Sequence, residues 1–182
     1  MNTLKASFDE SLPDPNLLWP INWSGVTLLA HSELLRLRAY HDMTGTPTIG
    51  WGETENVKMG MVWTREQADR DLLHGLIEYT DAVRAMCKGP TGSNQLAALV
   101  VCTWNIGIAG MSGSSMMRKH NLGDFVGASA AFALWNKAHV RGQLVVSAEL
   151  VGRRAEEAAL YSRIDDAKQR EPVPQTVVTP EP

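Results

Sequence analysis

The chain has 182 residues, of which 44% are hydrophobic, and its formal net charge is −3 at pH 7. This length suits one domain with at most two lobes, and the apolar fraction is too high for a disordered chain. The acidic balance argues against a nucleic-acid-binding protein. Two cysteines, Cys87 and Cys102, cannot make a disulfide scaffold or a four-cysteine zinc site. We therefore expect two free thiols, and the histidine spacing indicates no metal site.

The N-terminal segment does not have the pattern of a targeting sequence. Met1–Asn22 contains one lysine and three acidic residues. It lacks the basic start and the apolar stretch of a signal peptide, and no apolar run in the chain reaches the roughly 18 residues of a membrane span. We therefore expect a protein made in the cytoplasm, without an export signal or a membrane anchor.

The first elements in chain order are an arm and a helix. Residues 1–23 are polar and broken by prolines, which predicts an extended arm held to the body by Trp19, Ile21 and Trp23. Ser24 is a good N-cap for a helix, because the apolar residues that follow it have helical spacing.

A small β-hairpin and a long helix follow. Hydrophobic and polar residues alternate over 35–40, and the segment Asp42–Pro47 is typical of a turn, so residues 48–52 are expected to return as a second strand. Thr64 and Gln67 then form the pattern of a capping box, which predicts a long helix to about Cys87.

The rest of the chain is expected to be a helical lobe and a tail. From Ser93 the apolar spacing is helical almost to the end, and four prolines in the last twelve residues predict disorder there. The predicted fold class is α+β: a small β-hairpin lobe and a helical C-terminal lobe joined by a long helix. The expected boundaries are an arm at 1–23, a two-lobed domain at 24–164 and a flexible tail at 165–182.

Three polar residues of the small lobe could carry chemistry. Glu33 lies at the end of the first helix, Asp42 in the turn and Thr48 at the start of the return strand. Two carboxyls that face each other across a cleft can hydrolyse a glycosidic bond, because one donates a proton to the leaving oxygen while the other, ionised, orients a nucleophile. Taken alone, this spacing is more simply explained by solvated surface groups.

The pattern Glu33-x8-Asp42-x5-Thr48 resembles the catalytic segment of the phage-type lysozymes, glycoside hydrolase family 24. The resemblance extends from about Ser24 to Tyr161. It is carried by further segments at the family's spacing: Thr64-Arg65-Glu66-Gln67-Ala68, Asn94-Gln95-Leu96-Ala97-Ala98-Leu99, Trp104-Asn105-Ile106-Gly107-Ile108, Gly113-Ser114-Ser115, Trp135-Asn136-Lys137-Ala138 and Gly152-Arg153-Arg154-Ala155-Glu156.

This resemblance implies a muramidase that hydrolyses the β-1,4 bond between N-acetylmuramic acid and N-acetylglucosamine in peptidoglycan glycan strands, without a cofactor. Glu33 would be the general acid, and Asp42 and Thr48 would position the attacking water, which implies inversion at the anomeric carbon. The implied role is host lysis by a monomeric phage enzyme. It would wait in the host cytoplasm until a holin opens the membrane and then act on the periplasmic wall. Two alternatives stay open: a non-catalytic peptidoglycan-binding phage-particle or effector protein, and a lytic transglycosylase.

The chain departs from the family's pattern in three places. Leu34 stands where a glycine usually follows the catalytic glutamate, which predicts a changed corner between helix and strand. Glu53 replaces a common histidine, and it is either a solvated carboxylate or a group that tunes Glu33 or contacts substrate. His139–Val151 replaces a short glycine-rich loop, and it is either a surface loop or a different roof to the cleft.

Several residues have both a substrate-binding and a structural interpretation. Asn105 and Glu53 are candidates for substrate contact, as are Trp104, which could equally belong to the core, and Ser114, which could equally cap a helix. For Arg153-Arg154, we expect one arginine to fasten the C-terminal helix by an ion pair and the other to face solvent. Bidentate fixing of a carboxylate near the active site is a further alternative.

Overall fold

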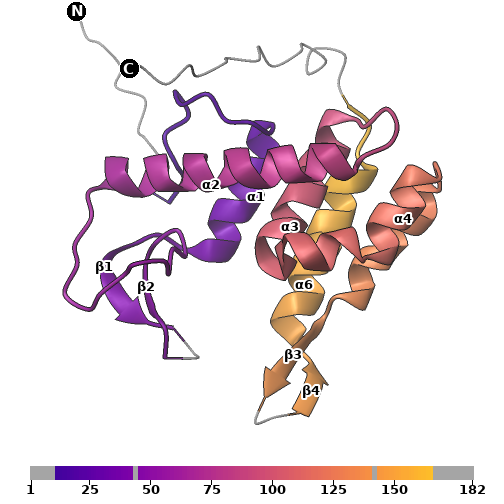
Figure 1. The fold of residues 1–182 in the computed structure, drawn as a ribbon. Coiled ribbons are helices and arrows are strands. Elements are labelled where there is room, and N and C mark those ends of the chain that lie inside the picture. The colour runs from indigo at the N-terminus through magenta and orange to yellow at the C-terminus, as the bar shows by residue number, and fades with distance from the viewer. Residues whose placement is uncertain (1–10, 43–44, 141–142, 166–182) are drawn as a thin grey trace, which may run out of the picture.

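The computed structural model describes residues 11–42, 45–140 and 143–165. Figure 1 shows a long helix, α2, that crosses the molecule and joins a small lobe built on a β-hairpin to a helical lobe. This arrangement confirms the α+β fold expected from the sequence. The elements are α1 (Trp23–Glu33), β1 (Arg36–His41), β2 (Pro47–Gly50), α2 (Arg65–Met86), α3 (Ser93–Ser112), α4 (Ser115–Asn121), α5 (Phe125–Ala131), the 3-10 helix η1 (Phe132–Leu134), β3 (Lys137–Val140), β4 (Gln143–Val146) and α6 (Ala148–Ser162).

The first helix begins at a different cap from the one expected. Asn22, not Ser24, caps α1, because its Oδ1 accepts a hydrogen bond from the Gly25 N–H at 3.0 Å. The Asn22 amide also donates to Asn94 Oδ1 at 2.8 Å, which ties the start of α1 to the start of α3. The asparagine amide provides both a donor and an acceptor, so one side chain can cap its own helix and bind a second one.

The small lobe has a third strand-like segment that the sequence did not indicate. β1 and β2 pair antiparallel, with Tyr40 opposite Thr48. On the other edge of β1, the Ala39 N–H donates to the Met61 carbonyl at 3.0 Å, and the Trp63 N–H donates to the Leu37 carbonyl at 2.9 Å. β1 therefore has hydrogen-bonded neighbours on both edges.

The interlobe helix α2 has the predicted start and nearly the predicted end. Thr64 and Gln67 form the capping box, and the helix ends at Met86 with Cys87 as its C-cap. Its core face follows helical spacing and consists of Ala68, Leu72, Leu76, Thr80 and Val83, all buried.

Helix α3 is the central helix of the larger lobe. Among the described residues, it alone is long and apolar enough by length and composition to span a membrane. It packs instead against α1, α2 and α6, and residues 97–103 are buried. Gly107 interrupts its helical geometry with φ 77° and ψ 160°, a conformation essentially restricted to glycine.

A second β-hairpin corrects the expectation of helix throughout the larger lobe. β3 and β4 pair antiparallel and overlap the segment His139–Val151, for which the sequence predicts a surface loop or a cleft roof. The Ser147 N–H donates to the Asn136 carbonyl at 2.9 Å and closes the base of the hairpin. The side chains of Leu144, Val145 and Val146 are exposed. Adjacent β-branched residues favour a strand over a helix, and Figure 1 shows the hairpin projecting from the lobe.

The chain segments that flank the two lobes are bound to them. Trp19 and Ile21 are buried in the core, whereas Trp23 is 38% exposed and does not anchor the arm. At the other end, the Asp165 carboxylate accepts hydrogen bonds from the Ser93 N–H at 2.8 Å and the Asn94 N–H at 2.9 Å. Asp165 was assigned to the tail, yet it supplies an acceptor at the N-terminus of α3, where side-chain acceptors are scarce because Gly92 is the N-cap.

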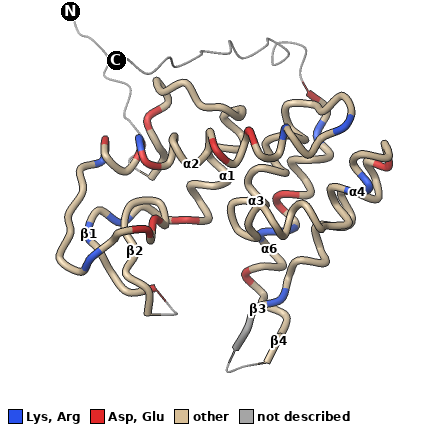
Figure 2. The backbone as a smooth tube through the Cα atoms, in the orientation of Figure 1, with Lys and Arg blue, Asp and Glu red and all other residues tan. Residues whose placement is uncertain are grey.

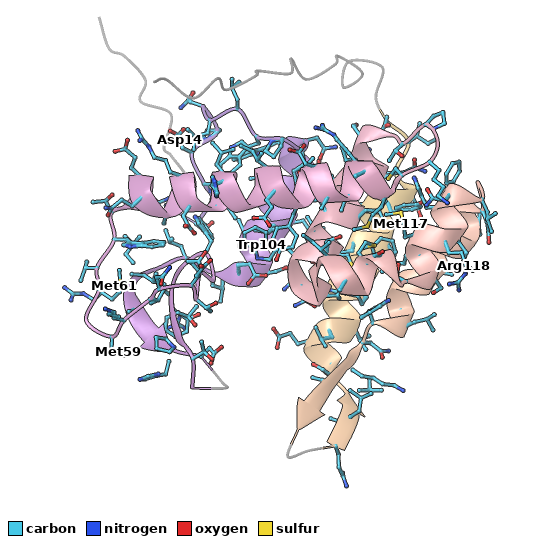
Figure 3. All side chains as sticks on the ribbon, in the orientation of Figure 1. Asp14, Met59, Met61, Trp104, Met117 and Arg118 are labelled. Atoms are coloured by element: carbon cyan, nitrogen blue, oxygen red, sulfur yellow. The ribbon has the colours of Figure 1, made fainter. Side chains whose placement is uncertain are left out.

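Asp69 joins the arm, the small lobe and α2. Its carboxylate is buried and accepts hydrogen bonds from the Asp14 N–H at 3.0 Å, from Trp51 Nε1 at 2.8 Å and from Arg65 Nε at 3.0 Å. In Figure 3, Asp14 and Trp104 lie on opposite sides of α2. A buried carboxylate is tolerated only when such donors replace its hydration.

We predict that Asp69→Ala destabilises the protein by about 3 kcal/mol, because it leaves buried donors unsatisfied. Asp81→Ala on the same helix is the matched control, since the Asp81 side chain is 72% exposed and lies 3.9 Å from Arg84. Urea unfolding of both variants measures the difference. Equal midpoints for the two variants would contradict the role assigned to Asp69.

Candidate active site

Glu33 lies where the two lobes meet. It is the last residue of α1, and its side chain is 19% exposed. On one side lies the backbone of Gly52 in the small lobe, where an added Cβ would stand 3.3 Å from Glu33 Oε2. Gly52 also has a φ of 104°, so glycine is favoured there by its conformation as well as by the space.

On the other side of Glu33 is α6 of the larger lobe. Arg153 Nη2 donates to Glu33 Oε1 at 2.8 Å, and the arginine side chain is only 9% exposed. The expectation that Arg153 or Arg154 faces solvent is wrong, because Arg154 is 1% exposed. Arg153 does bind the carboxylate of Glu33, but through one nitrogen and one oxygen rather than in the bidentate manner of the sequence-based alternative.

Asp42 and Thr48 are both attached to Thr46 of the hairpin turn. Asp42 Oδ1 accepts a hydrogen bond from the Thr46 N–H at 2.8 Å, and the Asp42 N–H donates to the Thr46 carbonyl at 3.0 Å. The Thr48 hydroxyl donates to the same carbonyl at 3.0 Å, and Thr48 is buried. Both side chains are thus bonded to the same residue of the hairpin turn.

A buried group of charged side chains lies behind Arg153. Glu157 is fully buried, and its Oε1 accepts from Arg153 Nε at 3.4 Å and from Arg154 Nη2 at 2.8 Å. Arg154 also donates to Asn105 Oδ1 at 3.1 Å and to Cys102 Sγ at 3.2 Å. Burial raises the pKa of Glu157, and the two arginines oppose this shift. Sequence reasoning did not single out Glu157, although its spacing of three and four residues from the arginines was a signal for it.

The candidate substrate-binding residues lie in different environments in the structure. Asn105 is exposed, and Trp104 is half-buried, tilted against Tyr79 at a centroid distance of 5.1 Å. In Figure 3, Trp104 lies below α2, between the lobes. Ser114 is 3% exposed, and its hydroxyl caps α4 by accepting from the Met117 N–H at 3.0 Å. Helix capping, the alternative for Ser114, is therefore what the structure shows.

Glu53 is part of a carboxyl pair that the sequence did not indicate. Its Oε1 accepts the backbone N–H of Thr54 at 2.6 Å and also that of Glu55, so the carboxylate holds the turn that follows β2. Burial and the charge of Glu53 raise the pKa of Asp71 on α2 to about 6, and His74 opposes the shift. Perturbed carboxyls of this kind concentrate at functional sites. Asp71 therefore joins the candidates that sequence reasoning missed, since no motif marks it.

Charges of both signs occur on both lobes (Figure 2). Along the sequence the charges are divided more clearly, with five basic and nine acidic residues in 24–81 and nine basic and four acidic residues in 82–164.

Within the part of the chain that the structure describes, no group of three or more His, Cys, Asp or Glu side chains could hold a metal ion.

We predict that Asp71→Asn stabilises the protein by about 1 kcal/mol at pH 7.5, a value reduced for solvent screening of a half-buried group. Because the folded state raises the pKa of Asp71, its carboxyl favours folding below pH 4, and this contribution is lost as the pH rises to about 6. The gain in Tm over wild type should therefore be present at pH 7.5 and absent at pH 3.5. An equal gain at both pH values would contradict the carboxyl pair.

The connection between α1 and β1, directly after Glu33, gives a further prediction. Leu34 has φ 50° and ψ 106°, and its side chain is 63% exposed. A leucine in the left-handed region is strained, whereas glycine is not. Leu34→Gly should therefore stabilise the fold by about 1 kcal/mol despite the greater freedom of glycine in the unfolded chain. Urea unfolding measures this gain, with Leu122→Gly as an exposed control that should lose stability.

Comparison with known proteins finds relatives that match most of the chain. The phage lysozyme family model matches residues 30–157. The endolysin of Acyrthosiphon pisum secondary endosymbiont phage 1 is 37% identical over 141 residues, which are 78% of this chain and 97% of that protein. The endolysin of Salmonella phage P22 is 36% identical over 146 residues, 78% of this chain and 97% of that one.

Solved structures give the same result. The endolysin from Escherichia coli O157:H7 phage FAHEc1 superposes with a TM-score of 0.75 at 40% identity and covers 78% of this chain and 92% of its own. The muramidase domain of SpmX from Asticaccaulis excentricus has a TM-score of 0.74 at 34% identity and covers 80% and 99%. By sequence and by fold, the chain belongs to the phage lysozyme family.

Proposed function

We propose that this chain hydrolyses the β-1,4 bond between N-acetylmuramic acid and N-acetylglucosamine in peptidoglycan, with Glu33 as the general acid. The observation that supports this most directly is the position of the Glu33 carboxyl, enclosed between the Gly52 backbone of one lobe and Arg153 of the other. A carboxyl held at one geometry where two lobes meet can donate a proton to a leaving oxygen bound between them.

In the proposed reaction, Glu33 protonates the glycosidic oxygen while the bond to the anomeric carbon breaks. Asp42 and Thr48 orient a water molecule that attacks the opposite face of the sugar, and the Asp42 carboxylate takes its proton. The shared attachment of both side chains to Thr46 supports this role, since it fixes their mutual geometry. Attack on the opposite face inverts the anomeric configuration.

The oxocarbenium-like transition state carries positive charge, which the Asp42 carboxylate stabilises. Arg153 has a different role in the proposed reaction, because it binds the Glu33 carboxyl through one oxygen, Oε1. The other oxygen, Oε2, is the one that faces Gly52. We assign the transferred proton to Oε2, because a guanidinium donates hydrogen bonds only and so favours an unprotonated Oε1.

Glu33→Gln tests this assignment, because glutamine keeps the size of the side chain and removes its acidic proton. We expect the rate of turbidity loss of outer-membrane-permeabilised Gram-negative cells to fall by about 10³-fold. Glu149→Gln is the control, since Glu149 is an exposed carboxylate on α6, the helix that carries Arg153. Equal rates in wild type and Glu33→Gln would exclude Glu33 as the acid.

The products distinguish the three functions that the sequence leaves open. Hydrolysis releases reducing ends, a lytic transglycosylase releases anhydro-muramic ends, and a non-catalytic binding protein releases neither. Mass spectrometry of digested peptidoglycan separates these outcomes. Proton NMR during early turnover then gives the configuration of the new reducing end.

We also propose that the protein acts in phage-induced lysis as a monomer that reaches the wall after a holin has opened the inner membrane. The phage endolysins among its relatives support this role. Expression in a bacterial host with and without a holin tests it, since lysis should require both proteins. Lysis without the holin would show another route to the wall, such as the one that the name SAR-endolysin indicates for a relative from Pseudomonas phage phiKMV.

A further inference from the structure

Arg153 is held at two points. Its Nη2 donates to Glu33 Oε1 at 2.8 Å, and its Nε lies 3.4 Å from Glu157 Oε1, one turn further along α6. The guanidinium is planar and its donors have fixed directions, so contacts at two of its nitrogens determine its rotation. Glu157 is the one carboxylate besides Glu33 that pairs with Arg153 among the described residues.

Glu157 makes the same kind of contact with its other neighbour. Arg154 Nη2 donates to Glu157 Oε1 at 2.8 Å and to Asn105 Oδ1 at 3.1 Å. Each arginine therefore connects Glu157 to a residue of the candidate site, Arg153 to Glu33 and Arg154 to Asn105. The carboxylate lies at the centre of this branched network, in the interior of the larger lobe.

The free-energy cost of burying these charged side chains indicates that they have a role beyond packing. Glu157 and Arg154 are 0% and 1% exposed, and removing such charges from water has a desolvation penalty that can exceed the attraction between them. Well-packed apolar side chains of similar volume would stabilise the lobe as well or better. What they could not supply is an acceptor for Arg153 Nε.

We infer that Glu157 is a positioning residue for the muramidase reaction, acting through Arg153 on the carboxyl of Glu33. This inference rests on the proposed function. Glu157 keeps the guanidinium at one rotation, so that Arg153 presents Nη2 to Glu33 and leaves the second carboxyl oxygen for proton transfer. Without that anchor, Arg153 can rotate about its side-chain bonds, and the carboxyl of Glu33 loses its fixed orientation.

The test is the pair Glu157→Gln and Glu156→Gln. These neighbours on α6 differ in burial, since Glu156 is exposed and Glu157 is not. With soluble peptidoglycan fragments as substrate, we expect Glu157→Gln to lower kcat about 10-fold with KM within about twofold of wild type. The neutral amide oxygen of glutamine binds the guanidinium of Arg153 more weakly than a carboxylate does, and orientation of the acid acts on the transition state. Glu156→Gln should match wild type. An unchanged kcat in folded Glu157→Gln overturns the inference, and so does a loss confined to KM.

A double-mutant cycle with Arg153→Lys tests whether Glu157 acts on Glu33 through Arg153. If Glu157 acts through Arg153, the two substitutions together should lower kcat no more than Arg153→Lys alone, whereas additive losses would overturn the route. Glu157→Leu with Arg154→Met replaces the buried pair by apolar groups and removes the acceptor of Arg153 Nε altogether, and it also serves as the test if Glu157→Gln does not fold. That variant should keep the low kcat, and wild-type activity in it overturns the inference.

Wild type and Glu33→Gln are measured in the same experiment. If wild type releases reducing ends and Glu33→Gln does not, while Glu157→Gln equals wild type, only the positioning role fails. If wild type releases none, the proposed function fails and the positioning role fails with it.

Discussion

The ion pair between Glu33 and Arg153 connects parts of the chain that are 120 residues apart, at a distance of 2.8 Å. Its geometry requires α1 to end where α6 passes, and it therefore requires the packing of both helices on α3. The small lobe reaches the same carboxyl through Gly52. A single side chain thus depends on both lobes, and any change in their relative placement alters its surroundings.

Much of the fold could be predicted because its helices and its first hairpin are marked by patterns of neighbouring residues in the sequence. The capping box at Thr64 and Gln67 marks the start of α2, and alternation marks the first hairpin. Local signals could not identify Arg153 as the partner of Glu33, because the two residues are 120 positions apart and meet only through tertiary packing. The β3–β4 hairpin was missed for a different reason: its strands of four residues are too short for a periodicity to separate them from a helix.

The replacement at Glu53 shows how one departure from the family's pattern affects the electrostatics of the helix that joins the lobes. A carboxylate there holds the turn after β2 through backbone donors and, with burial, raises the pKa of Asp71 on α2. The sequence indicated an acid near the catalytic pair. The acid on α2 that responds to it was not indicated, because an interaction between a turn and a neighbouring helix leaves no pattern in the chain.

The contact between Asp165 and the start of α3 has a topological consequence. Ser93 and Asp165 are 72 residues apart, and their hydrogen bonds at 2.8 and 3.0 Å bring the two ends of the larger lobe's sequence together. A segment whose ends meet can be joined there and reopened elsewhere without changing its contacts. The larger lobe is therefore suited to circular permutation, with new termini in the β3–β4 hairpin that projects from it (Figure 1).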